Sequence, residues 1–151
     1  MMKLTFLCSM VPMLTFGMDL CGDDRLAALS MIETGNDDHM VGRAGEISRY
    51  QIIKSEWHSV TNCTNYTDRE TARAVTLRLM DKKVQNFQSS FKRPPTDFEI
   101  YGLWNAPSQV MQGRVSRRVA ERCQRFVNLC ELFQPRMQTA NVNKRPTALI
   151  F

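Results

Sequence analysis

The sequence predicts a mainly α-helical fold with little or no β-sheet, and three segments carry that prediction. Residues 68–90 repeat apolar side chains at helical spacing, residues 96–105 begin with a capping pattern, and residues 115–133 form a second long apolar stripe. Apolar residues that recur every three or four positions mark one face of a helix. The 151 residues are enough for one domain with a sizeable core.

The first helix is expected over residues 23–34. The acids Asp23 and Asp24 suit its N-terminus, and Gly35 suits a left-handed C-terminal cap. Apolar side chains surround almost the whole segment, which is typical of a buried helix. One face of this helix carries Leu26, Leu29 and Glu33. A carboxylate therefore ends the core-facing stripe of an otherwise apolar helix.

An irregular lobe is expected between this helix and the next. Residues 36–50 are rich in Gly and Asp, which indicates a loop or a short irregular strand. Residues 51–60 fit either a brief strand or a short helix, and the polar residues after them fit a loop.

The rest of the domain is expected to be helical. The helix at residues 68–90 ends before the sequence KRPP, and Thr96-x-x-Glu99 forms a capping box for a helix that stops at Pro107. The inward side chains of the long helix are Leu77, Met80, Val84, Phe87 and Phe91. Those of the last helix are Val119, Cys123, Phe126, Cys130 and Phe133, with its arginines facing outward.

The two ends of the chain are expected to lie outside the folded domain. Lys3, an apolar run to Phe16 and a small residue after it have the pattern of a cleaved signal peptide at residues 1–17. A run of about 13 residues is too short for a bilayer, which needs about 20, so no membrane span is expected after cleavage. An uncleaved anchor or a buried helix is the alternative. The domain is then residues 18–134, and residues 135–151 form a basic flexible tail.

Cysteine usage is compatible with export. The cysteines after the signal segment are Cys21, Cys63, Cys123 and Cys130. An even count in an exported domain permits two disulfides. Cys123 and Cys130 lie about 10.5 Å apart along one expected helix, too far to bond each other. Any bridge therefore joins that helix to Cys21 or Cys63, and four reduced cysteines are the alternative. Because there is no CxxC pair or histidine cluster, we expect no metal site and no cofactor.

The chain carries a net charge of +5, and its arginines cluster late in the sequence. One interpretation is a solvated helix face with a basic tail, and the other is attraction to an anionic polymer, either nucleic acid or cell wall. Aromatic residues are not interleaved with the basic ones, and no base-reading motif is present. Nucleic acid is therefore not an expected partner.

Glu33 is the leading candidate for chemistry. Burial on an apolar helix face favours the protonated acid, and so does the negative end of the helix dipole. A carboxylic acid that keeps its proton is what general acid catalysis needs. The structural alternative is a glutamate that ends the helix in solvent.

The segment after Glu33 strengthens the catalytic interpretation. Its glycines let the backbone approach a ligand. Groups suited to sugars or peptides follow as the hydroxyls of Ser48 and Tyr50 and the amide of Gln51. Aromatic platforms are available at Trp57, Tyr101 and Trp104, although each ring alone is more often part of a core.

Residues 33–51 resemble the catalytic segment of the soluble lytic transglycosylase family. That family has Glu-Ser, a glycine twelve residues after the glutamate and a glutamine eighteen residues after it. This chain has Glu33-Thr34, Gly45 and Gln51 at those spacings. The later family motif Ala-Tyr-Asn-Ala-Gly-Pro is similar to GLWNAP, residues 102–107. The resemblance covers roughly residues 24–130.

This chain departs from the family pattern at three places. The family's serine nine residues after the glutamate is Gly42 here, and its Gly-Leu-Met is Ser48-Arg49-Tyr50. Its tyrosine, which bonds the catalytic acid, aligns with Trp104. An indole donates one hydrogen bond and accepts none. Tyr101, one helical turn earlier, is the candidate replacement.

The resemblance implies a lysozyme-like fold and a secreted or periplasmic, monomeric enzyme. The implied substrate is the peptidoglycan glycan strand, cut at the β-1,4 bond between N-acetylmuramic acid and N-acetylglucosamine. Glu33 would act as the single acid and base and would give a 1,6-anhydro product. The implied substrate contacts are Ser48, Tyr50, Gln51, Tyr101, Trp104 and Asn105.

Two alternatives stay open. A hydrolysing muramidase of the goose-type lysozyme kind would need a second carboxylate. The candidates for this role are Asp37, Asp38 and Glu46. A wall-binding module on the same fold would need none, and the departures at Gly42 and Trp104 favour it.

Overall fold

The computed structural model describes residues 22–142, with side chains as far as Gln134. The expected signal peptide and the end of the chain from residue 143 lie outside the described residues. The described part is mainly α-helical, as predicted. Its one strand-type pairing is an isolated antiparallel bridge between Ile47 and Ile52. No helix in residues 22–142 is long and apolar enough to cross a membrane.

The first helix, α1, spans Asp23–Thr34 as expected. Gly35 ends it with φ 67°, and its N–H donates to the Met31 carbonyl oxygen at 3.1 Å. A left-handed residue at this point costs least when it is glycine. The helix buries Leu26, Ala28 and Leu29.

The irregular lobe contains one short helix, α2 at Lys54–His58, which settles the choice between strand and helix there. Trp57 of α2 is fully buried, and its indole N–H donates to the Cys63 carbonyl oxygen at 2.7 Å. Its ring meets Tyr66 edge-on at a centroid distance of 5.3 Å. Trp57 is therefore a core residue, and the lobe is built around it.

The long helix α3 spans Arg69–Phe91. Asp68 caps its N-terminus, and the Asp68 carboxylate accepts the Thr71 N–H at 2.8 Å. Helix α4 spans Asp97–Asn105 and begins with the predicted capping box at Thr96. The expected stop at Pro107 was only partly right. A short helix, α5 at Pro107–Met111, follows immediately, because proline is well tolerated in the first turn of a helix.

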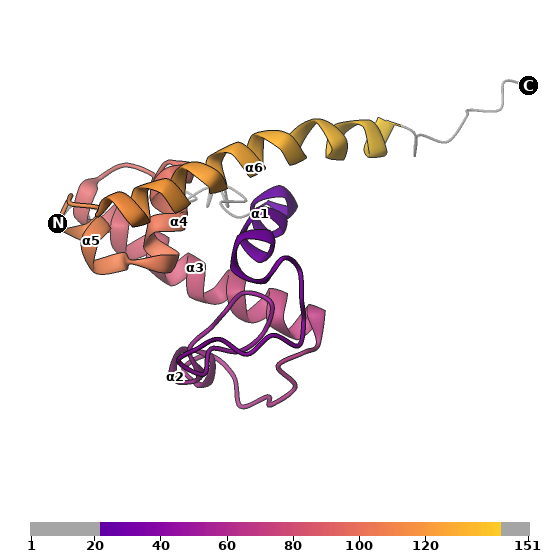
Figure 1. Cartoon of the computed structure of the whole chain (residues 1–151). Coiled ribbons are helices and arrows are strands. Elements are labelled where there is room, and N and C mark those ends of the chain that lie inside the picture. Colours follow the sequence, from indigo (N-terminus) through magenta and orange to yellow (C-terminus); the bar gives the residue numbers. More distant parts are fainter. Residues whose placement is uncertain (1–21, 143–151) are drawn as a thin grey trace, which may run out of the picture.

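The last helix, α6, spans Arg117–Val142 and packs against α1 and α4 (Figure 1). Leu29 of α1, Tyr101 of α4 and Phe126 of α6 belong to the same buried cluster. The predicted end near Phe133 was too early. The last turns of α6 run beyond the rest of the body (Figure 1). The predicted end rests on the apolar stripe, which marks the buried part of a helix. The turns of α6 that extend beyond the body carry no such stripe, so the sequence pattern does not indicate them.

Cys63 and Cys123 lie in different environments. Cys63 is exposed in the irregular lobe and Cys123 is buried on α6, and neither bonds another described cysteine. Burial raises the pKa of the Cys123 thiol to about 11. Cys21 lies outside the described residues.

The α4 capping box predicts acid-sensitive stability. The Arg93 guanidinium bonds both Glu99 carboxylate oxygens, at 2.6 and 2.8 Å, and together with the Thr96 N–H it holds the pKa of Glu99 at about 2. Since this pKa lies below the ordinary 4.5, the stabilisation is complete above pH 4.5 and is lost as the pH falls toward 2. Urea unfolding should show Glu99→Gln less stable than wild type at pH 7. The difference should shrink between pH 4.5 and 2, whereas a Glu131→Gln control should show no such trend.

Candidate active site

A cleft of about 310 Å³ opens beside the C-terminal end of α1. Its walls come from the irregular lobe on one side and from α4 and α6 on the other. The residues that line it are Glu33, Arg43, Glu46, Gln51, Ile53, Glu56, Trp104, Asn105 and Arg122. A cleft of this size with a few convergent polar groups is typical of a small-molecule or oligosaccharide site. Four residues predicted to form the site are among them, namely Glu33, Gln51, Trp104 and Asn105.

Glu33 occupies the last turn of α1 and faces this cleft. Its side chain is only 8% exposed, which rules out a glutamate that simply ends the helix in solvent. Oε1 accepts a hydrogen bond from the Tyr101 hydroxyl at 2.8 Å, and Oε2 faces the Arg122 guanidinium at 3.0 Å. The carboxylate is therefore held at both oxygens.

Tyr101 holds Glu33 from the buried side. The residue is 0% exposed, and its ring stacks on Phe126 at a centroid distance of 5.5 Å. Burial, and then the neighbouring Glu33 carboxylate, raise the pKa of the Tyr101 hydroxyl, so it stays a hydrogen-bond donor. In the family that the sequence motifs resemble, a tyrosine aligned with Trp104 makes this hydrogen bond, and here Tyr101 makes it, one turn earlier on α4. Tyr101 touches Glu33 and does not line the cleft.

Arg122 is the partner of Glu33 that the sequence did not predict. All arginines of the last helix were expected to face outward, but Arg122 reaches inward from α6 to Glu33 and lies 5.7 Å from the Tyr101 ring centroid. A signal was present in the sequence. Arg122 follows Val119 by three residues and precedes Phe126 by four, and both of these are buried. Residues at such spacings share one helix face.

A tight turn presents Gln51 to the cleft. Ile47 and Ile52 exchange both backbone hydrogen bonds at 2.8 Å, and the turn between them contains Ser48 with φ 63° and Gln51 with φ 53°. Non-glycine residues seldom adopt such angles, and they cluster at functional sites. The Gln51 amide nitrogen donates to the Ser48 and Met40 carbonyl oxygens at 3.4 Å, which leaves its oxygen as an acceptor.

The same turn corrects two expected substrate contacts. Ser48 is 3% exposed and Tyr50 is 5% exposed, and neither lines the cleft. The Ser48 hydroxyl instead accepts the Tyr50 N–H at 3.3 Å. Ile47, Tyr50 and Ile52 all pack into the main core. These side chains anchor the turn in the core, and none of them lines the cleft.

Trp104 and Asn105 end α4 at the cleft. The Trp104 indole N–H donates to the Tyr50 carbonyl oxygen at 3.1 Å, so this ring supports the turn and offers the cleft no N–H. Lys83 lies 5.9 Å from the ring centroid and pairs with Glu56 at 2.8 Å. Asn105 is exposed at the rim.

Among the candidate second acids, only Glu46 lines the cleft. Asp38 pairs with Arg69 at 2.6 Å and with Arg49 at 3.4 Å, and Asp37 accepts the His39 N–H at 2.8 Å. The Asp38 pair with Arg69 ties the loop to the first residue of α3, and neither aspartate lines the cleft. Glu56 also lines the cleft and was not predicted. Within residues 22–142, no three His, Cys, Asp or Glu side chains are grouped as a metal site requires.

Gly42 makes room for two cleft side chains. A Cβ atom at Gly42 would overlap with Glu46 Oε2 and with Gln51 Oε1. The glycine at position 42 therefore goes together with a carboxylate at position 46, which accepts the Ala44 N–H at 2.9 Å.

We expect Gly42→Ser to displace Glu46 and Gln51 and to weaken the binding of a sugar in the cleft about tenfold, the loss typical of one or two hydrogen bonds. The unfolding midpoint should fall as well, because the added Cβ atom would also lie 2.9 Å from the Glu46 Cβ, which can move only together with its backbone. The exposed neighbour Ala44→Ser serves as the control. Unchanged sugar binding by Gly42→Ser, measured by calorimetric titration, would exclude Glu46 and Gln51 from ligand binding.

Comparisons with protein-family models, with curated proteins and with solved structures give no match for this chain. The resemblance therefore rests on the two sequence motifs, and the function must be argued from the chemistry of the cleft.

Proposed function

We propose that this protein is an exported lytic transglycosylase that cleaves the β-1,4 bond between N-acetylmuramic acid and N-acetylglucosamine in peptidoglycan. The observation that carries the proposal is Glu33, a nearly buried carboxylate bonded to Tyr101 at the base of a cleft. The amides of Gln51 and Asn105 and the ring of Trp104 line the same cleft, and such a mixture suits a sugar. The N-terminal signal pattern supports a secreted or periplasmic location.

The proposed reaction needs one carboxylate acting twice. Protonated Glu33 gives its proton to the glycosidic oxygen, and the bond from C1 breaks with its electron pair on that oxygen. The acetamido oxygen of the substrate bonds to C1 and carries the positive charge. Ionised Glu33 then removes the proton of the 6-hydroxyl, whose oxygen attacks C1 and releases the acetamido group. The product is a 1,6-anhydro sugar, and no water is consumed.

A hydrolysing muramidase is the second candidate, and the place of Glu46 favours it. Glu46 lines the same cleft as Glu33, so a carboxylate is available to activate water. In that mechanism the products carry ordinary reducing ends, and Glu46→Gln would abolish their release.

Mass spectrometry of purified peptidoglycan digested by the wild-type protein tests both candidates. The lyase gives fragments with 1,6-anhydro ends, which are lighter than the hydrolase products by one water. If all fragments carry reducing ends, the protein is a muramidase and the lyase proposal is wrong. Sedimentation with cell walls without release of any fragment would replace both by a wall-binding module.

A further inference from the structure

The resting state of Glu33 conflicts with its proposed role as an acid. Both of its oxygens already accept hydrogen bonds, from Tyr101 at 2.8 Å and from Arg122 at 3.0 Å. A general acid needs a proton on an oxygen that points at the leaving group. An oxygen facing a guanidinium cannot deliver a proton in that direction. Proton delivery from Glu33 into the cleft is therefore favoured when one of the two partners moves away as the substrate binds.

Arg122 is the partner that can move. Tyr101 is fully buried and its ring is stacked on Phe126, whereas the Arg122 side chain is 32% exposed and lines the cleft. The guanidinium has five N–H donors, so binding Glu33 leaves donors for a ligand. Its best ligand is a second carboxylate, which it can bind through two parallel hydrogen bonds.

The other acids of the cleft are engaged, so they do not compete strongly for Arg122. Glu56 pairs with Lys83 at 2.8 Å, and Glu46 accepts the Ala44 N–H at 2.9 Å. Arg43 contributes a second guanidinium to the cleft lining. An anionic group that enters the cleft thus meets two cations, one of which restrains the acid.

We propose that Arg122 positions Glu33 and selects the substrate. Its guanidinium leaves Glu33 only when a carboxylate of the substrate takes the place of the Glu33 carboxylate as its partner. This inference rests on the proposed function. In glycan, the lactyl group of muramic acid carries a carboxylate on the sugar whose C1 is attacked. That carboxylate is free when the stem peptide has been removed and is an uncharged amide when the peptide is present. The preferred substrate is therefore glycan without stem peptides, which an amide-hydrolysing reaction must supply.

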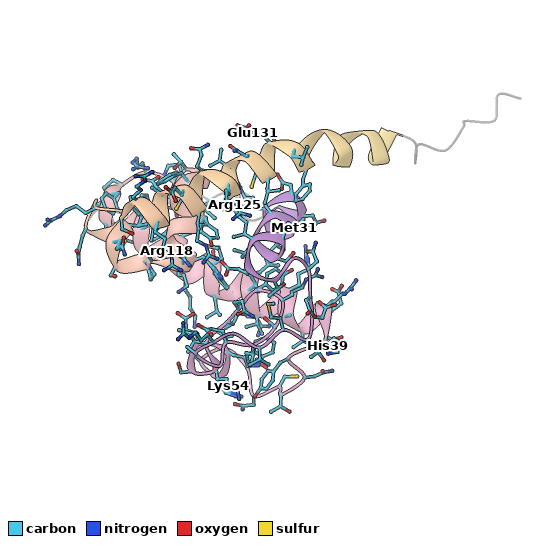
Figure 2. All side chains as sticks on the ribbon, viewed as in Figure 1. Met31, His39, Lys54, Arg118, Arg125 and Glu131 are labelled. Carbon is cyan, nitrogen blue, oxygen red and sulfur yellow. The ribbon has the colours of Figure 1, made fainter. Side chains whose placement is uncertain are left out.

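The test compares two forms of one glycan, peptide-free strands and the same strands with their lactyl carboxylates converted to methylamides. We expect wild-type kcat/KM to be about tenfold or more higher on the free acid, the effect of losing one charge-assisted hydrogen bond. Arg122→Met should abolish this preference, and Arg122→Lys should keep part of it. Arg118→Met, an exposed arginine one turn earlier on α6 (Figure 2), should behave as wild type.

The preference is a ratio measured within one variant, so a smaller folded fraction of Arg122→Met does not affect it. Equal preference in wild type and Arg122→Met would overturn the inference. So would a wild type that cleaves both glycans equally, and that result would leave the proposed function intact.

A binding measurement separates the inference from the proposed function. Calorimetric titration should show wild type binding N-acetylmuramic acid about tenfold more tightly than its methylamide, and Arg122→Met binding both equally. If this difference appears but no glycan is cleaved, the proposed function fails and the carboxylate site stands. If the two sugars bind wild type equally, the inference is wrong whatever the turnover.

Discussion

Replacing Glu33 with glutamine is expected to lower the rate of glycan cleavage by about 10²–10⁴-fold, the usual contribution of a general acid or base. The amide cannot donate a proton to a leaving oxygen as a carboxylic acid does. Its carbonyl oxygen can still accept the hydrogen bond from Tyr101, and Arg122, which is 32% exposed, can turn to solvent. The fold should therefore persist, and the loss should fall on kcat. Clearing of a peptidoglycan suspension and single-turnover product release measure it.

Glu131→Gln is the matched control for this experiment. Glu131 is an exposed glutamate on α6 (Figure 2), outside the cleft. The Glu131→Gln substitution also replaces a carboxylate with an amide and removes one negative charge. Because it lies outside the cleft, the activity of this variant should equal that of wild type. If Glu33→Gln clears peptidoglycan as fast as this control, Glu33 is not the acid and the proposed mechanism must be abandoned.

The sequence predicted the place of Glu33 because local rules determine it. The left-handed cap at Gly35 and the capping box at Thr96 satisfy backbone groups within a few residues, so their side-chain requirements are visible in sequence. The helical period then places Glu33 on the inner face of α1. The Glu33–Tyr101 hydrogen bond joins α1 to α4, and only the motif resemblance indicated that these two residues could pair.

Two failed predictions, Ser48 and Tyr50, concern side chains whose direction no period determines. Ser48 and Tyr50 lie in the turn between Ile47 and Ile52, which contains two positive φ angles. Side chains in such a turn do not point alternately to two faces as they do in a strand. The turn buries both, and their polarity alone suggested the opposite. The prediction that Arg122 faces outward was wrong for another reason, because an arginine at the edge of an apolar stripe is normally solvated. Its inward direction depends on a carboxylate that lies far away in the sequence.

Phe126→Ala is expected to have the largest effect on stability, a loss of about 3–5 kcal/mol. Phe126 is 1% exposed on α6 and belongs to the cluster that joins α1, α4 and α6. Domains of ordinary stability have about 5–15 kcal/mol in total, so the thermal midpoint should fall by roughly 10 °C or more. Leu132→Ala, at an exposed position of the same helix, should stay within about 0.5 kcal/mol of wild type.

Phe126→Ala should also reduce the activity of the protein that remains folded, because the Phe126 ring packs against the Tyr101 ring. The two rings stack at 5.5 Å, and the Tyr101 hydroxyl fixes Glu33 Oε1. Removing the ring leaves a cavity beside Tyr101, so the hydroxyl is no longer held at one position. We expect kcat, corrected for the folded fraction from circular dichroism, to fall further in Phe126→Ala than in Val84→Ala, another fully buried side chain of the core. An equal loss in both variants would mean that Phe126 acts on the whole fold alone and does not position the acid.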